Sequence, residues 1–353
     1  MIGGRSLARR LRRRLMTFSL KDLVRWSPLE DPAPGYTIVI GCVTELSGLA
    51  LANLKALERC DLSGAAEILL VFDRPLSEVD VLSRLPEAVA GRPVRTLGYT
   101  QQQDRVARRI GWGWVYSWMS WSIGVGASRT RAVILHDLDA MPLSGDLFAR
   151  LNDSFQSSNA IFQGVRPYSG NGFTEADGFV TTYEMFLDAE VLRSKAEAIE
   201  AFSRFGRRGE DWVDYDTFLY LEERLGSAEL SPLDAEELFH PSQLLCQYTD
   251  HLNAPHRLPA GGGNLVLLPY LLHLGGEEEP FYEALEALKG GANSIPLRAK
   301  MLRLEGASPE QVTWQRVQVE RLELFLFGAV RPEITDWLNA VVEAAMPVSG
   351  TMR

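Results

Sequence analysis

Two aspartates separated by one residue are the strongest chemical signal in the chain. Asp137 and Asp139 directly follow Ala132–Leu135, an apolar, β-branched run typical of a buried strand in a parallel sheet. In open α/β sheets, ligands bind beyond the carboxyl ends of the strands. Side chains at positions i and i+2 of an extended segment point to the same side. The pair therefore suits a hard divalent cation, Mg²⁺ or Mn²⁺, that carries a phosphate-bearing substrate. The alternative is a polar turn, in which aspartate is common.

A second acidic group lies further along the chain. Glu210 and Asp211 precede Val213–Leu225, which we interpret as an amphipathic helix. Acidic side chains near a helix start are stabilised by the helix dipole, so both residues have a structural interpretation as well as a catalytic one. Asp214 and Asp216 add two more carboxylates to this segment.

A late histidine is the third candidate. His273 comes shortly after Leu265–Leu268, which reads as a strand, and precedes Gly275 and Gly276. That position would let the imidazole reach a site, although a single histidine is more often structural than a ligand.

The loops after the first two expected strands also carry polar residues. Thr44 and Glu45 follow the strand expected at Tyr36–Val43, and Asp73 follows the strand expected at Glu67–Phe72. These positions could meet a nucleotide base and ribose. Asp73 precedes Arg-Pro, so it can equally be a turn former.

The elements that position these residues alternate. Helices at 47–60 and 77–85 separate the first two strands and a third strand at 93–97. This order predicts an α/β fold with a mostly parallel sheet flanked by helices. A tryptophan-rich helix at 111–126 precedes the Asp-x-Asp strand, and the spacing of its tryptophans favours a core role.

Charge is unevenly distributed. The net charge is −10, yet residues 1–26 hold eight basic residues and one acid, which gives +7 there and −17 in the remainder. An acidic body argues against nucleic acid as the main partner. A basic amphipathic helix at 5–16 could lie on an anionic membrane surface; a solvated terminus is the alternative. We expect residues 1–26 to serve peripheral membrane attachment and not the fold.

The chain divides into three predicted regions. Residues 1–34 are a basic segment and linker, and residues 35–276 are the α/β domain, with halves at 36–140 and 141–276. Residues 277–353 are a helical region, with helices expected at Phe281–Leu288, Ile295–Leu304, Pro309–Phe327 and Pro332–Ala345. The chain has three cysteines without a C-x-x-C pair and no apolar run of ~20 residues. These features predict a cytoplasmic location, in solution or at the inner face of the membrane.

The order of the motifs resembles that of the GT-A fold glycosyltransferases over residues 36–276. An Asp-x-Asp closes the nucleotide-binding half, and Asp177-Gly178-Phe179 matches the glycine-containing loop that follows it. Gly209-Glu210-Asp211 matches the x-Glu-Asp motif, and His273 matches the late histidine.

The resemblance implies a metal-dependent transfer of a sugar from a nucleotide-diphosphate sugar to an acceptor hydroxyl on a glycan, lipid-linked or protein acceptor. Asp137, Asp139 and His273 would hold Mn²⁺ or Mg²⁺, which neutralises the charge on the leaving group. Asp211, supported by Glu210, would face the acceptor, as general base if the enzyme inverts. Asp137 and Gly178 would also contact the donor, and Thr44, Glu45 and Asp73, which follow the first two strands, are the remaining expected donor contacts.

Two other classes fit part of the pattern. Haloacid-dehalogenase-like phosphohydrolases also carry Asp-x-Asp at a strand end, but Ala140-Met141 replaces their usual Gly-Thr, and three expected strands precede the motif. A non-catalytic scaffold on the same fold is the third class, and the intact aspartates count against it.

Overall fold

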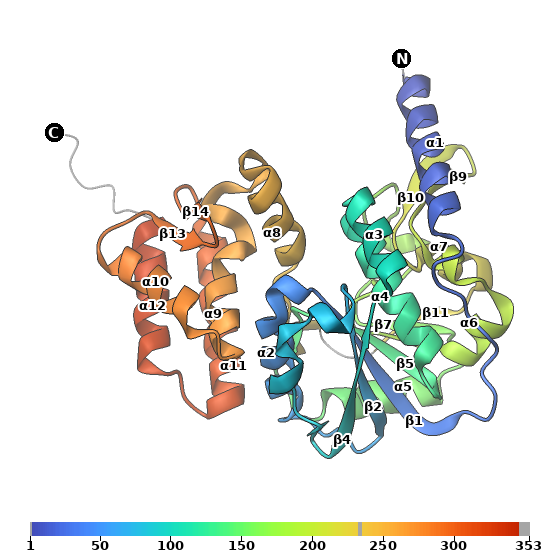
Figure 1. Cartoon of the computed structure of the whole chain (residues 1–353), viewed down its shortest axis with the longest axis horizontal. Helices are drawn as coiled ribbons and strands as arrows, with labels where there is room; N and C mark the ends of the chain where they lie inside the picture. Colours follow the sequence, from blue (N-terminus) through green and yellow to red (C-terminus); the bar gives the residue numbers. More distant parts are fainter. Residues whose placement is uncertain (1, 232–234, 346–353) are drawn as a thin grey trace. The chain divides into compact units, whose positions relative to one another are not determined.

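The computed structural model describes residues 2–231 and 235–345, with only the backbone of residues 2–7. The chain forms two compact units (Figure 1). The first comprises residues 1–45, 61–138 and 146–235, and the second comprises residues 46–60, 139–145 and 236–353. The divisions expected from the sequence at residues 34 and 276 stay predictions.

An eight-stranded sheet forms the centre of the first unit. Its spatial order is β11 (Ala228–Leu230), β7 (Phe162–Gly164), β8 (Met185–Asp188), β5 (Thr130–His136), β1 (Ala33–Cys42), β2 (Ala65–Phe72), β4 (Arg92–Gly98) and β3 (Ala88–Val89). The pairs β5–β1, β1–β2, β2–β4 and β11–β7 are parallel, whereas β8 is antiparallel to both its neighbours and β3 is antiparallel to β4. The predicted α/β class with a mostly parallel, mixed sheet is confirmed.

The helices of the first unit are α1 (Ile2–Leu20), α3 (Gln101–Ile110), α4 (Gly113–Ala127), α5 (Leu147–Ser157), α6 (Ala189–Lys195) and α7 (Leu219–Leu225). Of these, α4, α5 and α6 pack on strands of the sheet. The tryptophan-rich α4 lies directly on β1, because Gly124 lacks a Cβ, which would sit 2.2 Å from Val39. Trp118 and Trp121 are buried in the same core, as their spacing predicted. The helix expected at 77–85 is instead two short 3₁₀ turns, Leu76–Glu78 and Asp80–Arg84.

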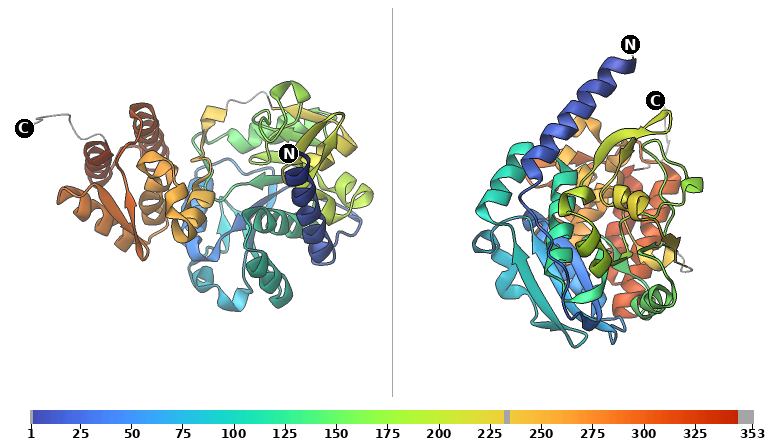
Figure 2. Two further views of the ribbon diagram at one scale, coloured as in Figure 1. Left: turned by 90° about the horizontal axis from the view of Figure 1, so that it is seen from above. Right: turned by 90° about the vertical axis from the view of Figure 1, so that its right-hand side faces the viewer.

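The N-terminal segment belongs to the fold, which corrects the expectation that residues 1–26 take no part in it; their attachment to a membrane stays a prediction. Leu20 and Val24 are buried in the main core of the first unit. The Trp26 indole Nε1 donates a hydrogen bond of 2.8 Å to the carbonyl oxygen of Ser122 on α4. In the sequence, the many arginines of residues 1–26 make the apolar residues that pack on the core hard to recognise. Figures 1 and 2 show α1 held at its C-terminal end, with its first turns extending outward.

The segment around Glu210 and Asp211 is a β-hairpin and not the start of a helix. Strand β9 (Arg204–Arg208) pairs with β10 (Asp211–Tyr215), and Gly209 in the connecting turn has a φ of 60°. A glycine tolerates this left-handed conformation, which suits a two-residue hairpin loop. The helix expected at Val213–Leu225 therefore begins only at α7, and the apolar residues before it alternate along a strand.

The second unit is mainly helical. Its elements are α2 (Ser47–Leu57), β6 (Met141–Pro142), β12 (Leu238–Phe239), α8 (Leu244–Asn253), α9 (Leu268–Leu274), α10 (Glu278–Lys289), β13 (Ser294–Leu297), β14 (Lys300–Arg303), α11 (Pro309–Phe327) and α12 (Pro332–Ala345). The bounds predicted for α11 and α12 are confirmed. The helix expected at Ile295–Leu304 is a hairpin of β13 and β14. The strand expected at Leu265–Leu268 is wrong, because a 3₁₀ segment leads there into α9. None of the described helices is both long and apolar enough to cross a bilayer.

Candidate active site

The two aspartates lie in a turn at the carboxyl end of β5. The strand is buried from Ala132 to His136, and Asp137, which follows it, is partly exposed. Leu138 turns inward and is buried, as is the side chain of Asp139. A turn, and not the expected extended backbone, thus brings the two carboxylates to one place.

A histidine that the sequence did not single out joins them. Strand β12 pairs with β6 in the second unit, and the Leu143 amide donates a 2.8 Å hydrogen bond to the Glu237 carbonyl. This pairing sets His240, the residue after β12, with its Nε2 at 3.9 Å from Oδ1 of Asp139. One ligand atom from each of Asp137, Asp139 and His240 lies within 4.8 Å of the others.

This donor set fits a divalent cation. Two carboxylates and an imidazole suit Mn²⁺, and carboxylates alone suit Mg²⁺. Ligand atoms at about 2.1 Å from one ion lie ~3.0–4.2 Å apart, depending on the angle between them, so the three groups would have to draw closer together to share one ion. Asp139 is buried, with 4% of the residue exposed.

The expected histidine lies elsewhere in the second unit. His273 stacks on Phe281, with ring centroids 4.4 Å apart, and its Nε2 is 3.3 Å from the guanidinium of Arg331. Arg331 in turn binds the buried Glu323 through two nitrogens. Burial and Arg331 both lower the pKa of His273. Within the described residues, the structure groups His240, and not His273, with the aspartates.

A buried hydrogen-bonded pair supports the end of β5. His136 contacts Glu184 through Nδ1, and both side chains are fully buried. The backbone of Glu184 has a φ of 48°, a left-handed conformation that is strained for a residue with a side chain. The pair fixes the strand residue that directly precedes Asp137.

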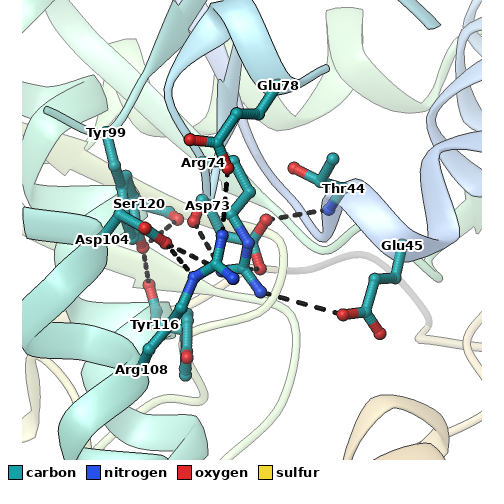
Figure 3. A network of polar contacts seen from close by, with 10 residues as sticks. All are labelled: Thr44, Glu45, Asp73, Arg74, Glu78, Tyr99, Asp104, Arg108, Tyr116 and Ser120. Atoms are coloured by element: carbon teal, nitrogen blue, oxygen red, sulfur yellow. Dashed lines mark hydrogen bonds and ion pairs between the residues drawn. The ribbon is translucent and has the colours of Figure 1, made fainter. Parts of the chain in front are cut away.

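The three residues expected to bind a nucleotide lie together in the first unit (Figure 3). Strands β1 and β2 are parallel neighbours whose ends match at Cys42 and Phe72. The Thr44 amide donates a 2.9 Å hydrogen bond to Oδ1 of Asp73. Burial raises the pKa of Asp73, and the hydrogen bond from Thr44 opposes that rise. The structure thus brings Thr44, Glu45 and Asp73 together.

Arg74 lies among the carboxylates of this cluster. In the sequence, its place between Asp73 and Pro75 indicates only a turn. Its guanidinium nitrogens lie 3.3 Å from Asp104, 3.6 Å from Asp73 and 3.8 Å from Glu45. Figure 3 shows these three carboxylates around the Arg74 side chain. The cluster is therefore a polar group in which one guanidinium faces three carboxylates, next to the carboxyl ends of two central strands.

The glycine loop is fixed by its aspartate. Asp177 accepts hydrogen bonds from the Thr174 amide and hydroxyl, at 2.7 and 3.0 Å, and pairs with Arg208. These contacts, the Thr174 amide first, lower the pKa of Asp177 to about 2. Gly178 follows with a φ of 77°, which a residue with a side chain adopts only at a cost.

The carboxylates of the hairpin and its extension differ in environment. Glu210 and Asp211 are exposed at the tip of the hairpin. Asp214 is buried and pairs with Arg9 and Arg13 of α1. Asp216 is partly buried and accepts a 2.7 Å hydrogen bond from the Thr217 amide.

The charge of Asp137, at the end of β5, contributes to the electrostatic environment of Asp216. Burial raises the pKa of Asp216 to about 6, with further rises from the charges of Asp214 and Asp137. Burial also raises the pKa of Tyr183 to about 12, and Asp137 contributes there too. Asp137, Asp216 and Tyr183 therefore share one electrostatic environment in the first unit.

Comparisons with known proteins give structural matches only. No family model matches the chain, and no curated protein matches its sequence. Among solved structures, S. aureus TarS 1–349 is 9% identical over 88% of this chain and 90% of that chain, with a TM-score of 0.38.

Two further matches carry transferase names. Galactosyltransferase LgtC, solved with donor and acceptor sugar analogs, is 10% identical over 85% of this chain and 99% of that chain, at a TM-score of 0.42. The mannosyltransferase PcManGT from Pyrobaculum calidifontis, solved with GDP-Man and Mn²⁺, is 12% identical over 97% of this chain and 94% of that chain, at a TM-score of 0.35.

Proposed function

We propose that this chain is a metal-dependent glycosyltransferase that moves a sugar from a nucleotide-diphosphate sugar to an acceptor hydroxyl. One observation carries the proposal. The parallel neighbours β5, β1 and β2 end at one edge of the sheet, and Asp137, Thr44 and Asp73 follow those ends. This is the edge where open α/β sheets bind ligands.

Asp137, Asp139 and His240 are the proposed metal ligands. A divalent cation held there supplies Lewis-acid stabilisation of the diphosphate leaving group. The hydrogen-bonded pair of His136 and Glu184 keeps the strand end, and with it Asp137, in place.

Asp73, Thr44 and Glu45 are the proposed contacts of the nucleoside. A carboxylate accepts hydrogen bonds from ribose hydroxyls or from a base N–H. Arg74, which faces these carboxylates, restrains their side chains before a ligand binds, and such preorganisation lowers the entropic cost of binding.

Asp216 is the proposed carboxylate for the reacting sugars, in place of Asp211. A general base must lie within reach of the proton it removes, and its pKa works best near the operating pH. The pKa of Asp216 is raised to about 6, partly by Asp137, whereas Asp211 is exposed at the hairpin. The catalytic roles expected for Asp211 and Glu210 stay predictions. Transfer rates of Asp211→Asn, Glu210→Gln and Asp216→Asn, measured at saturating donor, would compare the three carboxylates.

A phosphohydrolase of the haloacid-dehalogenase type is not favoured. In that family the Asp-x-Asp strand normally opens the domain, and here β1, β2 and β4 precede β5 in the chain. The Asp73 cluster on those earlier strands would also have no role in hydrolysing a simple phosphomonoester.

Calorimetric binding of Mn²⁺ with nucleoside diphosphates tests the proposal. Asp139→Asn and His240→Gln should each weaken metal-dependent nucleotide binding at least ~10-fold, as loss of a ligand or its support commonly does. His273→Gln is the matched control and should bind as the wild type does. Normal binding by a folded Asp139→Asn variant would remove the metal assignment.

A panel of nucleotide sugars then tests the reaction. The wild type with Mn²⁺ should slowly hydrolyse one donor in the absence of acceptor. Preference for simple phosphomonoesters would instead support the phosphohydrolase, and absence of both activities would support a scaffold.

A further inference from the structure

Helix α1 presents two opposite faces with different environments. At about 100° of rotation per residue, Leu11, Leu15 and Phe18 fall within a sector of roughly 60°. These three side chains are 58%, 61% and 69% exposed. Arg13 and Leu20 lie on roughly the opposite side of the helix and are buried.

The buried face attaches α1 firmly to the first unit. The Arg13 guanidinium lies 3.5 Å from the ring centroid of Trp112 and 4.6 Å from that of Trp114, and it pairs with Asp214 at 3.1 Å. Leu20 packs in the core below. The exposed apolar stripe is therefore not available for repacking against its own unit.

Basic side chains border the apolar stripe on both sides. Arg12 lies on one flank, and Arg14 and Lys21 lie on the other, all three exposed. Lys21 also lies 4.7 Å over the ring of Phe18. The chain outside residues 1–26 carries −17 against the +7 of this segment, so the positive charge is concentrated on this helix.

We propose that the Leu11-Leu15-Phe18 face of α1 docks on an anionic lipid surface. A narrow apolar stripe bordered by arginine and lysine is the pattern of a helix lying in the headgroup region, with apolar side chains inserted and cations on lipid phosphates. Helix α1 is not both long and apolar enough to cross a bilayer. The proposal does not depend on the transferase activity.

The anchored face gives this docking a fixed orientation. Arg9 and Arg13 both bind Asp214 on β10, and Asp216 follows two residues later. A lipid surface bound to the outer face of α1 thus meets the first unit in one orientation, with the helix as a rigid contact and not a flexible tail.

Co-sedimentation of the full chain with phosphatidylglycerol–phosphatidylcholine vesicles tests the proposal. The wild type should bind, bind phosphatidylcholine vesicles alone much more weakly, and be released by high salt. The variant Leu11→Ser/Leu15→Ser/Phe18→Ser should bind at least ~10-fold more weakly, since it removes the apolar area that enters the interface.

A matched variant controls for general loss of surface hydrophobicity. Met301→Ser/Val317→Ser/Leu324→Ser removes three side chains that are 55%, 44% and 53% exposed in the second unit, and it should bind vesicles like the wild type. Failure of the wild type to bind, or an equal loss in both triple variants, overturns the proposal. A third outcome also overturns it: the wild type self-associates, and the α1 triple variant is monomeric but still binds vesicles. The exposed stripe would then contact a second copy of the chain.

Discussion

At the scale of single residues, Asp216 makes a prediction that needs no assay of transfer. Its pKa is raised from 3.8 to about 6, chiefly by burial, so ionising it in the folded protein costs free energy. The stability it contributes is present below its unfolded pKa and is lost as pH rises through about 6. Asp216→Asn should therefore gain melting temperature relative to the wild type at pH 8 and show a smaller gain at pH 4.5.

The control for that measurement is Asp211→Asn. Asp211 is exposed. The change in melting temperature that Asp211→Asn causes, relative to the wild type, should therefore be the same at pH 4.5 and at pH 8. An Asp216→Asn difference that is the same at pH 4.5 and pH 8 would contradict the assigned environment.

The two histidines show what a sequence can and cannot indicate at this scale. The glycines after His273 were a local signal, but contacts with Phe281 and Arg331 occupy that ring. His240 reaches Asp139 only through the pairing of β12 with β6, strands of two residues each that lie almost a hundred positions apart in the chain. A histidine before a proline in an irregular segment was the only sign.

At the scale of elements, prediction succeeded where one pattern ran for many residues. The strands β1, β2 and β5 and the helices α11 and α12 lie where hydrophobic spacing and prolines indicated. The segment 213–225 failed because its apolar residues fit helical spacing and strand alternation equally for a few residues. Gly209, with its φ of 60°, was the turn signal that decides between them.

Helix α1 offers a matched pair of substitutions that tests its attachment. Leu20 is fully buried and Leu15 is 61% exposed on the same helix. Leu20→Ala should lower the free energy of unfolding by ~2–5 kcal/mol, the range for emptying a buried leucine site. Leu15→Ala should stay within ~0.5 kcal/mol, as exposed substitutions usually do. Urea unfolding of both variants measures the difference, and equal values would show that α1 is not part of the core.

At the scale of the whole molecule, the distribution of charge predicted an acidic globular body and a basic N-terminal segment. In the structure, this basic segment forms helix α1, which packs on the first unit. The proposed nucleotide contacts Thr44 and Asp73 follow two different strands, β1 and β2, and lie 29 positions apart in the chain. Such a site exists only in the folded chain, so a ligand that binds it must stabilise the native state over the unfolded one.

Thermal unfolding with Mn²⁺ and a panel of nucleoside diphosphates measures this coupling. At a ligand concentration of 100 times Kd, the expected stabilisation is ~2.7 kcal/mol, and one base should be preferred, because the cluster of Asp73, Thr44 and Glu45 offers fixed hydrogen-bonding groups. Asp139→Asn should lose the part of the ligand-induced stabilisation that depends on Mn²⁺. Asp73→Asn should lose the preference among bases and keep a response to Mn²⁺ with any diphosphate. A wild type whose melting temperature responds to the nucleotide equally with and without Mn²⁺ would mean that Asp137, Asp139 and His240 hold no cation during binding.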